Sequence, residues 1–248
     1  MARKMGKKRR QEVLEAFLTD IMLDYQKEFG EIIGRYSPVL KATVDSMIVQ
    51  AISETPDYME LLDARATLEN HTTMYGTAFK DELSKAFTEI SEKVVGHASF
   101  GEGLPSVDMT NAIRETIEEA YDYFFSILLP IVYELEGVAT GTVVLGESQG
   151  RLEHLSQLRD NLLYFLRRHV EAQASVIINL AVIEASKQHE ITLWKWSNRP
   201  ELTVSGVCEH CKSLAHGGLK NEGLYTLDSL PLLPVHPHCV CIVVPVIS

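Results

Sequence analysis

The sequence lacks any apolar run that can cross a lipid bilayer, which requires about 20 residues. Its best candidate, Phe124–Tyr133, is half that length and contains Pro130, a pattern typical of a buried helix segment with a kink. The charged N-terminal residues are not followed by an apolar segment, so we expect neither a secretion signal nor a membrane partner. Because 46% of the 248 residues are apolar and 23% are charged, disorder and fibrous architectures are also excluded.

Acidic residues are absent from the first ten positions, although the whole chain carries a net charge of −11. This segment, residues 1–10, holds six basic residues, so the remaining 238 residues carry 17 basic against 34 acidic side chains, a net charge of −17. A protein that coats nucleic acid over its whole surface is therefore excluded. The sequence predicts instead a basic arm on an acidic body, its charges being Arg3, Lys4, Lys7, Lys8, Arg9 and Arg10.

Residues 11–150 are predicted to form a helical domain. From Arg10 to about Tyr36, apolar residues recur three and four positions apart, which indicates one face of an amphipathic helix. The pairs Ser37-Pro38 and Thr55-Pro56 predict helix restarts near Val39 and Asp57. Two further helices are expected over about Ala78–Val95 and from Asp108 or Thr110 to Glu136.

Proline and glycine are both missing from residues 151–190, the longest periodic run of the chain. This run predicts a long connecting helix of up to roughly 60 Å, at about 1.5 Å per residue. The preceding residues 137–150 hold four glycines and lose the helical period, so they predict a hinge or a short hairpin.

Cysteine is absent before Cys208, and all four cysteines of the chain lie between Cys208 and Cys241. Strand patterns at Thr192–Trp196 and Cys239–Val246 enclose them, which predicts a small β-rich module over residues 191–248. The expected fold class is therefore mainly α with a small β-rich, zinc-binding module at the C-terminus (α+β).

The cysteines and histidines of this module predict a zinc site. Two thiolates in a CxxC turn can bind one ion, and a second cluster of His and Cys can complete a tetrahedron. Because His-x-x-Cys repeats the spacing of the first pair, the preferred ligands are Cys208, Cys211, His236 and Cys239. Cys241 is the alternative fourth ligand, since Cys239 and Cys241 would share one face of an extended segment.

Two other interpretations of these cysteines compete with a structural zinc. One is a redox CxxC pair, weakened because the pair is not expected to open a helix after a strand. The other is a catalytic zinc or a cysteine nucleophile, which would need an open coordination position and a nearby general base.

The C-terminal pattern resembles the phage head-morphogenesis family, the Mu F-like minor head proteins. The resemblance covers roughly the last hundred residues: a long helix, a Trp-containing strand, the CxxC of Cys208 and Cys211, and a His-Pro-x-Cys-x-Cys ending. Its matching residues are Trp194 or Trp196, Cys208, Cys211, Pro234, His236, Pro237, Cys239 and Cys241. The chain departs from the family at Val240, where members carry Arg, and at Val204-Ser205-Gly206-Val207, where members carry an acidic residue and Arg.

The resemblance implies a minor structural protein of a tailed phage or prophage, without enzymatic activity. Its expected partners are the portal protein and major capsid or scaffold proteins, and packaged DNA through the arm, in an assembly that holds several copies. The expected location is the virion, in the head interior or at the portal vertex, and the host cytoplasm during assembly. The alternatives are a zinc-ribbon nucleic-acid-binding regulator, which the scarcity of basic residues in 191–248 disfavours, and a helical adaptor.

Overall fold

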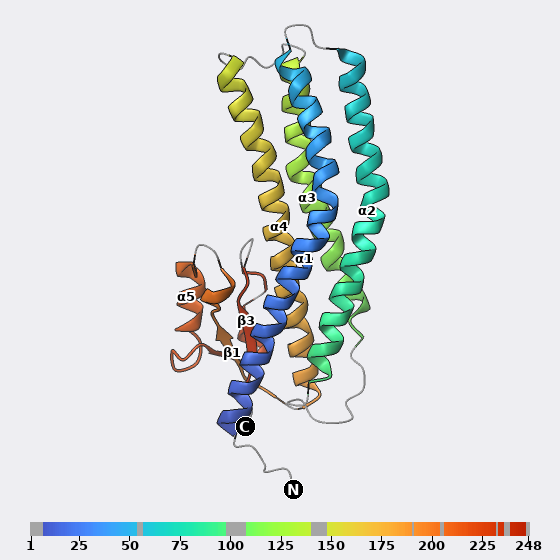
Figure 1. The fold of residues 1–248 in the computed structure, drawn as a ribbon. Coiled ribbons are helices and arrows are strands. Elements are labelled where there is room, and N and C mark those ends of the chain that lie inside the picture. The colour runs from blue at the N-terminus through green and yellow to red at the C-terminus, as the bar shows by residue number, and fades with distance from the viewer. Residues whose placement is uncertain are drawn as a thin grey trace. The chain divides into compact units, whose positions relative to one another are not determined.

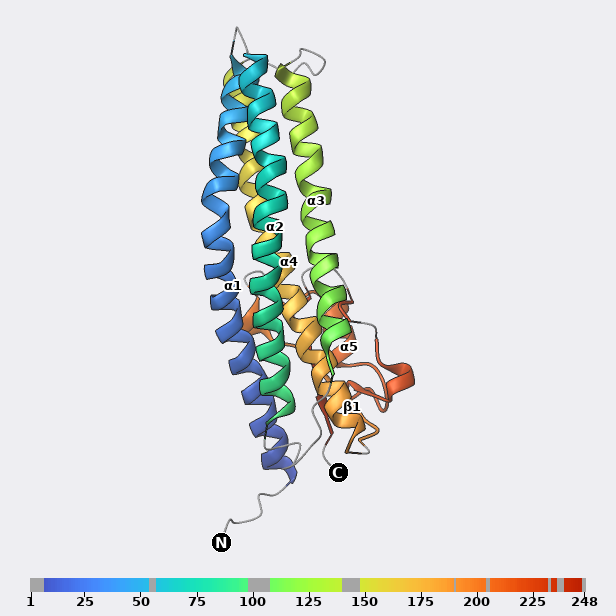
Figure 2. The same ribbon diagram turned by 90° about the vertical axis from the view of Figure 1, so that its right-hand side faces the viewer.

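The computed structural model describes residues 7–53, 57–97, 108–139, 148–189, 191–203, 206–231, 233–235 and 239–246. The chain is mainly helical and ends in a small three-stranded antiparallel sheet (Figures 1 and 2), as the composition and periodicity predict. Its elements are α1 (Lys7–Ile52), α2 (Tyr58–Val95), α3 (Thr110–Ala139), α4 (Ser148–Lys187), β1 (Trp194–Ser197), η2 (Pro200–Leu202), α5 (Glu209–Ala215), β2 (Leu224–Tyr225), η3 (Leu227–Ser229) and β3 (Ile242–Pro245). Over the described residues, none of the helices has both the length and the hydropathy needed to span a bilayer.

The chain divides into two compact units, and each of the four long helices contributes to both. Unit 1 comprises Met1–Glu28, Ser84–Ile117 and Val170–Ser248, and unit 2 comprises Phe29–Leu83 and Glu118–His169. The C-terminal strands therefore belong to the same unit as one end of the helices.

Unit 2 is a four-helix bundle whose neighbouring helices are joined by polar contacts. Glu82 of α2 accepts hydrogen bonds from Arg35 and Tyr36 of α1, and Lys80 pairs with Glu118 of α3 at 3.0 Å. Arg159 of α4 forms an ion pair with Asp45 of α1, and His154 of α4 contacts Glu134 of α3 at 2.7 Å. These pairs are partly exposed, so apolar burial between the helices supplies most of the stability of the bundle.

Unit 1 is built around the C-terminal part of α4. Almost every residue from Val170 to Ser186 is buried, whereas an amphipathic surface helix buries only one stripe. The strands lie beside this part of α4 in both views (Figures 1 and 2), and α1 also contacts the C-terminal module through a hydrogen bond from Gln26 to the Leu202 carbonyl at 3.2 Å. The C-terminal module is thus part of unit 1 rather than an isolated appendage.

The sheet has the strand order β2-β1-β3, with both pairs antiparallel. Trp194 of β1 lies opposite Tyr225 on one side and Pro245 on the other, and Trp196 lies opposite Val243. Both tryptophans are 1% exposed, while the intervening Lys195 is exposed, which is the period-two alternation expected of a half-buried strand.

One predicted break between helices is wrong, one is shorter than predicted, and one is confirmed. Helix α1 continues through Pro38, which is exposed, because Ile32, Ile33, Val44 and Met47 on both sides of it are buried and hold the helix together. The break expected over 137–150 is present but shorter: residues 137–139 belong to α3 and 148–150 to α4. The predicted hinge or hairpin itself falls on residues 140–147, which lie outside the described residues. The break near Thr55-Pro56 is correct, since α1 ends at Ile52 and α2 begins at Tyr58.

Two glycines in different settings test this account. Gly218, in the loop before β2, has a φ of +67°, and an added Cβ would collide with the Leu224 carbonyl, whereas the exposed Gly34 of α1 has open space around it. We expect Gly218→Ala to destabilise the C-terminal module by about 1–3 kcal/mol and Gly34→Ala to stabilise its helix by about 0.5–1 kcal/mol. Urea unfolding measures both effects. Tryptophan fluorescence follows the module, because both tryptophans lie in β1, and far-UV circular dichroism follows the helices. Equal changes in the free energy of unfolding for the two variants would contradict this prediction.

Candidate metal centre

Two elements bring three cysteines together. Cys211 lies in the first turn of α5, and Cys239 and Cys241 lie in the extended segment that leads into β3. Side chains alternate along an extended chain, so Cys239, Cys241 and Val243 share one face, and all three belong to the same buried cluster. Cys239 and Cys241 therefore both lie close to Cys211 once α5 packs against this face.

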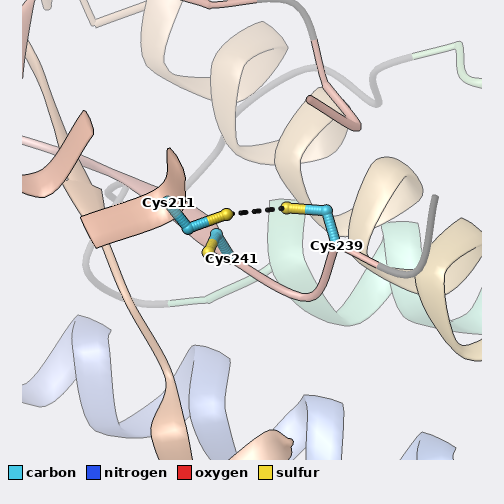
Figure 3. Close-up of side chains that lie close together, drawn as sticks. All are labelled: Cys211, Cys239 and Cys241. Atoms are coloured by element: carbon cyan, nitrogen blue, oxygen red, sulfur yellow. Dashed lines mark hydrogen bonds between the residues drawn. The ribbon is translucent and has the colours of Figure 1, made fainter. Parts of the chain in front are cut away.

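The three sulfur atoms lie close enough together to bind one metal ion. All three Sγ atoms lie within 4.8 Å of one another, and those of Cys211 and Cys239 are 3.8 Å apart and point toward each other (Figure 3). Zinc–sulfur bonds of about 2.3 Å at a tetrahedral angle separate neighbouring sulfurs by about 3.8 Å. The cluster can thus bind a metal ion with little rearrangement.

The cluster is surrounded by apolar side chains. Cys211 and Cys239 are 2% exposed and Cys241 is 4% exposed, and the cluster includes Trp194 and Trp196 of β1. Cys241 donates a thiol hydrogen bond to Asn198 Oδ1 at 3.5 Å, and the same oxygen accepts from Trp196 Nε1 at 3.2 Å. Three thiols that form no disulfide thus lie in an environment that disfavours an isolated negative charge.

This environment raises the pKa of two of the thiols. Burial, together with the neighbouring Cys239, raises the pKa of Cys211 to about 12. The pKa of Cys241 is raised further, first by hydrogen bonding with Cys239 and then by burial. A thiolate is the form that binds metal, so a divalent cation must displace these protons, and its own charge supplies the compensation that the cluster lacks.

Cys208 lies at the edge of the cluster and is exposed. It is the N-cap of α5, and its Sγ accepts a hydrogen bond from the Cys211 backbone N–H at 3.4 Å. The CxxC is not expected from the sequence to open a helix after a strand; it does open a helix, but the element that precedes α5 is η2 and not a strand. A redox role nevertheless requires a lowered thiol pKa, and the pKa of Cys211 is raised.

The predicted ligands are only partly within the described residues. Cys208, Cys211 and Cys239 are described, and Cys241, the predicted alternative, is a member of the buried triad. His236 lies outside the described residues, as do Arg3 and Lys4 of the basic arm. Lys7, Lys8, Arg9 and Arg10 are helical and form the first turn of α1.

Sequence reasoning missed the polar residues of α4 that hold the cysteine-bearing segment. Ser175 and Asn179 are 2% and 0% exposed, and both donate hydrogen bonds to the Cys241 carbonyl, at 2.8 and 2.9 Å. Their signal is present in the sequence: two small polar residues one helical turn apart within an otherwise buried run. Buried polar side chains require partners, so such a pair predicts a backbone or ligand against that face.

The comparisons with known proteins found no counterpart: no protein-family model, no curated protein and no solved structure matches this chain.

The exposure of the four thiols predicts different reactivities. In chelator-treated, reduced protein at pH 8, we expect one thiol, Cys208, to react rapidly with an aromatic disulfide reagent, because the other three are buried and the pKa of Cys211 is about 12. The remaining three should react only after unfolding in urea. Counting the released chromophore over time measures this, and Cys208→Ser should abolish the fast phase. Two or more fast thiols in the native protein would be incompatible with the buried triad.

Proposed function

We propose that this protein is a non-enzymatic minor head protein of a tailed phage or prophage, and that a structural zinc ion stabilises its C-terminal module. In this proposal it associates with the portal and the inner capsid during head assembly, DNA packaging or ejection. The single observation that carries the zinc part is the buried sulfur triad, whose Sγ atoms lie within 4.8 Å of one another. The phage part is supported by the order of the motif residues, from the Trp-containing strand to the His-Pro-x-Cys-x-Cys ending.

Zinc is the metal that the donors favour. Thiolates are soft ligands that select zinc over magnesium or calcium, and zinc's lack of redox chemistry suits a structural site. We infer that Cys211, Cys239 and Cys241 supply three ligands, and that Cys208 supplies the fourth by rotating its side chain toward Cys211. The backbone hydrogen bond that Cys208 Sγ already accepts from Cys211 supports this choice over His236.

Burial of the donors supports a structural role over a catalytic one. A catalytic zinc keeps an open position that a substrate or water can reach. The three cysteines of the triad are at most 4% exposed, and a fourth thiolate would close the tetrahedron. When bound, the zinc would supply folding free energy to a module whose described strands are only two to four residues long.

The first turn of α1 supports contact with a polyanion or an acidic partner. Lys7, Lys8, Arg9 and Arg10 place positive charge at the end of the helix where the macrodipole is already positive, and no acidic residue lies in that turn. Such charges oppose the macrodipole by about 0.3–1 kcal/mol each. Four in succession are a local disadvantage that an external anionic surface, such as DNA or an acidic patch of the portal, would offset.

Metal content tests the zinc part of this proposal. We expect about one zinc per chain in full-length protein purified without chelators, measured by mass spectrometry of the metal. Cys211→Ser, Cys239→Ser and Cys241→Ser should each lose most of it, because three remaining donors bind more weakly. Ser213→Ala, an exposed change on the same helix, serves as the control. Comparing Cys208→Ser with His236→Ala identifies the fourth ligand, and full zinc retention by two of the triad variants would refute the site.

Binding to assembly intermediates tests the phage part. We expect the full chain to co-sediment with portal-containing procapsids of the phage that encodes it, and not with shells that lack the portal. Replacing Lys7, Lys8, Arg9 and Arg10 by Gln should weaken the binding at low salt, while circular dichroism shows unchanged helix content. Equal sedimentation with both kinds of shell would contradict a portal-associated role.

A further inference from the structure

Asn179 of α4 is fully buried and binds the backbone on both sides of Ile242. Its Nδ2 donates to the Cys241 carbonyl at 2.9 Å, and its Oδ1 accepts from the Val243 N–H at 2.7 Å. Ser175, one turn earlier, donates to the same Cys241 carbonyl at 2.8 Å and accepts from Asn179 Nδ2 at 3.2 Å. We name this set of hydrogen bonds the α4 clasp.

The α4 clasp supplies hydrogen bonds that a further strand would otherwise supply at the β3 edge of the sheet. The Val246 N–H donates to the Leu193 carbonyl at 2.9 Å, and in an antiparallel ladder the bonded residues alternate. The backbone groups of Val243 and Cys241 therefore face away from β1, at the edge of the sheet. The Cys241 carbonyl and the Val243 N–H would otherwise be buried without hydrogen-bond partners, and the Asn179 side chain of α4 supplies a partner to each.

The α4 clasp acts on the backbone of a cysteine of the triad. Neither Ser175 nor Asn179 contributes a sulfur ligand, but two donors fix the carbonyl of Cys241, whose Sγ belongs to the triad. Groups that orient a ligand in this way set metal affinity, and their loss typically weakens binding by about 10–100-fold.

We propose that Ser175 and Asn179 are positioning residues for the metal centre, and that metal binding and the docking of β3 on α4 reinforce each other. This inference rests on the zinc site proposed above. The coupling is reciprocal: if the α4 clasp raises the affinity for the metal, the bound metal strengthens the α4 clasp by the same factor.

A matched pair of buried serines on α4 tests this inference. Ser175 binds the Cys241 carbonyl, whereas Ser186, also buried, binds the Val182 carbonyl of its own helix. In full-length protein titrated with zinc against a chromophoric chelator, we expect Ser175→Ala to bind about tenfold more weakly. Ser186→Ala should stay within about twofold of the wild type. Asn179→Asp, which keeps the acceptor for Val243 but replaces the donor to Cys241, should weaken binding at least as much as Ser175→Ala.

Two readouts separate positioning from a loss of stability. With cobalt in place of zinc, the sulfur-to-cobalt charge-transfer band should change in Ser175→Ala and not in Ser186→Ala. Hydrogen exchange of the Val243 amide should slow on zinc binding in the wild type, and slow less in Ser175→Ala. The two tryptophans of the chain, Trp194 and Trp196, lie in the same cluster as the sulfurs, so their fluorescence reports folding of the module in each sample.

The outcomes distinguish this inference from the proposed function. If the wild type binds no zinc, the zinc site itself is wrong. If the wild type binds zinc and Ser175→Ala binds it equally tightly, with an unchanged cobalt spectrum, the positioning role is wrong while the site remains. Equal weakening by Ser186→Ala would also overturn the positioning role, because it would trace the effect to general destabilisation of α4.

Discussion

The near-complete burial of the C-terminal part of α4 is the constraint on which unit 1 depends. A helix buried on nearly all sides can keep polar side chains only if they find partners, and Ser175 and Asn179 find theirs in the backbone of the segment that enters β3. Those hydrogen bonds fix where the last strand runs. The strand in turn determines which face Cys239 and Cys241 present, so the sulfur triad is a consequence of how α4 is covered.

The same constraint explains why the C-terminal module needs more than apolar packing. A sheet of such short strands has a small core of its own, and its partners on α4 and α1 supply much of its burial. The triad includes two thiols, those of Cys211 and Cys241, whose pKa values are raised by burial and by neighbouring cysteines. Without a cation these thiols remain protonated and contribute as small apolar groups. With a bound cation, the same burial strengthens the metal–sulfur bonds, because water that would compete for the metal is excluded.

Much of the helical architecture could be predicted from the sequence, since period and length are local properties. The run 151–190 corresponds to α4, and the strands at Trp194 and Ile242 follow the β-branched and aromatic alternation. The break predicted at Pro38 failed because buried residues on both sides outweigh one lost backbone hydrogen bond, a tertiary effect that a local rule does not contain. The helix opened by Cys208 was missed because cysteine is not among the favoured N-cap residues.

The candidate site was predictable in its chemistry but not in its membership. The spacing of Cys208 and Cys211 and the ending at Cys241 indicate a metal site, yet spacing alone could not rank Cys241 against His236. The register adds what spacing lacks for Cys241: the strand that follows it pairs with β1 at four positions, and Cys241 joins Cys211 and Cys239 in the buried triad. His236 lies outside the described residues. The Cys241 carbonyl, on the opposite side of the chain from β1, is left for α4 to bind. The position of the Cys241 sulfur and the hydrogen bonds to its carbonyl therefore depend on one register, and a slip by one residue would remove both from the cluster.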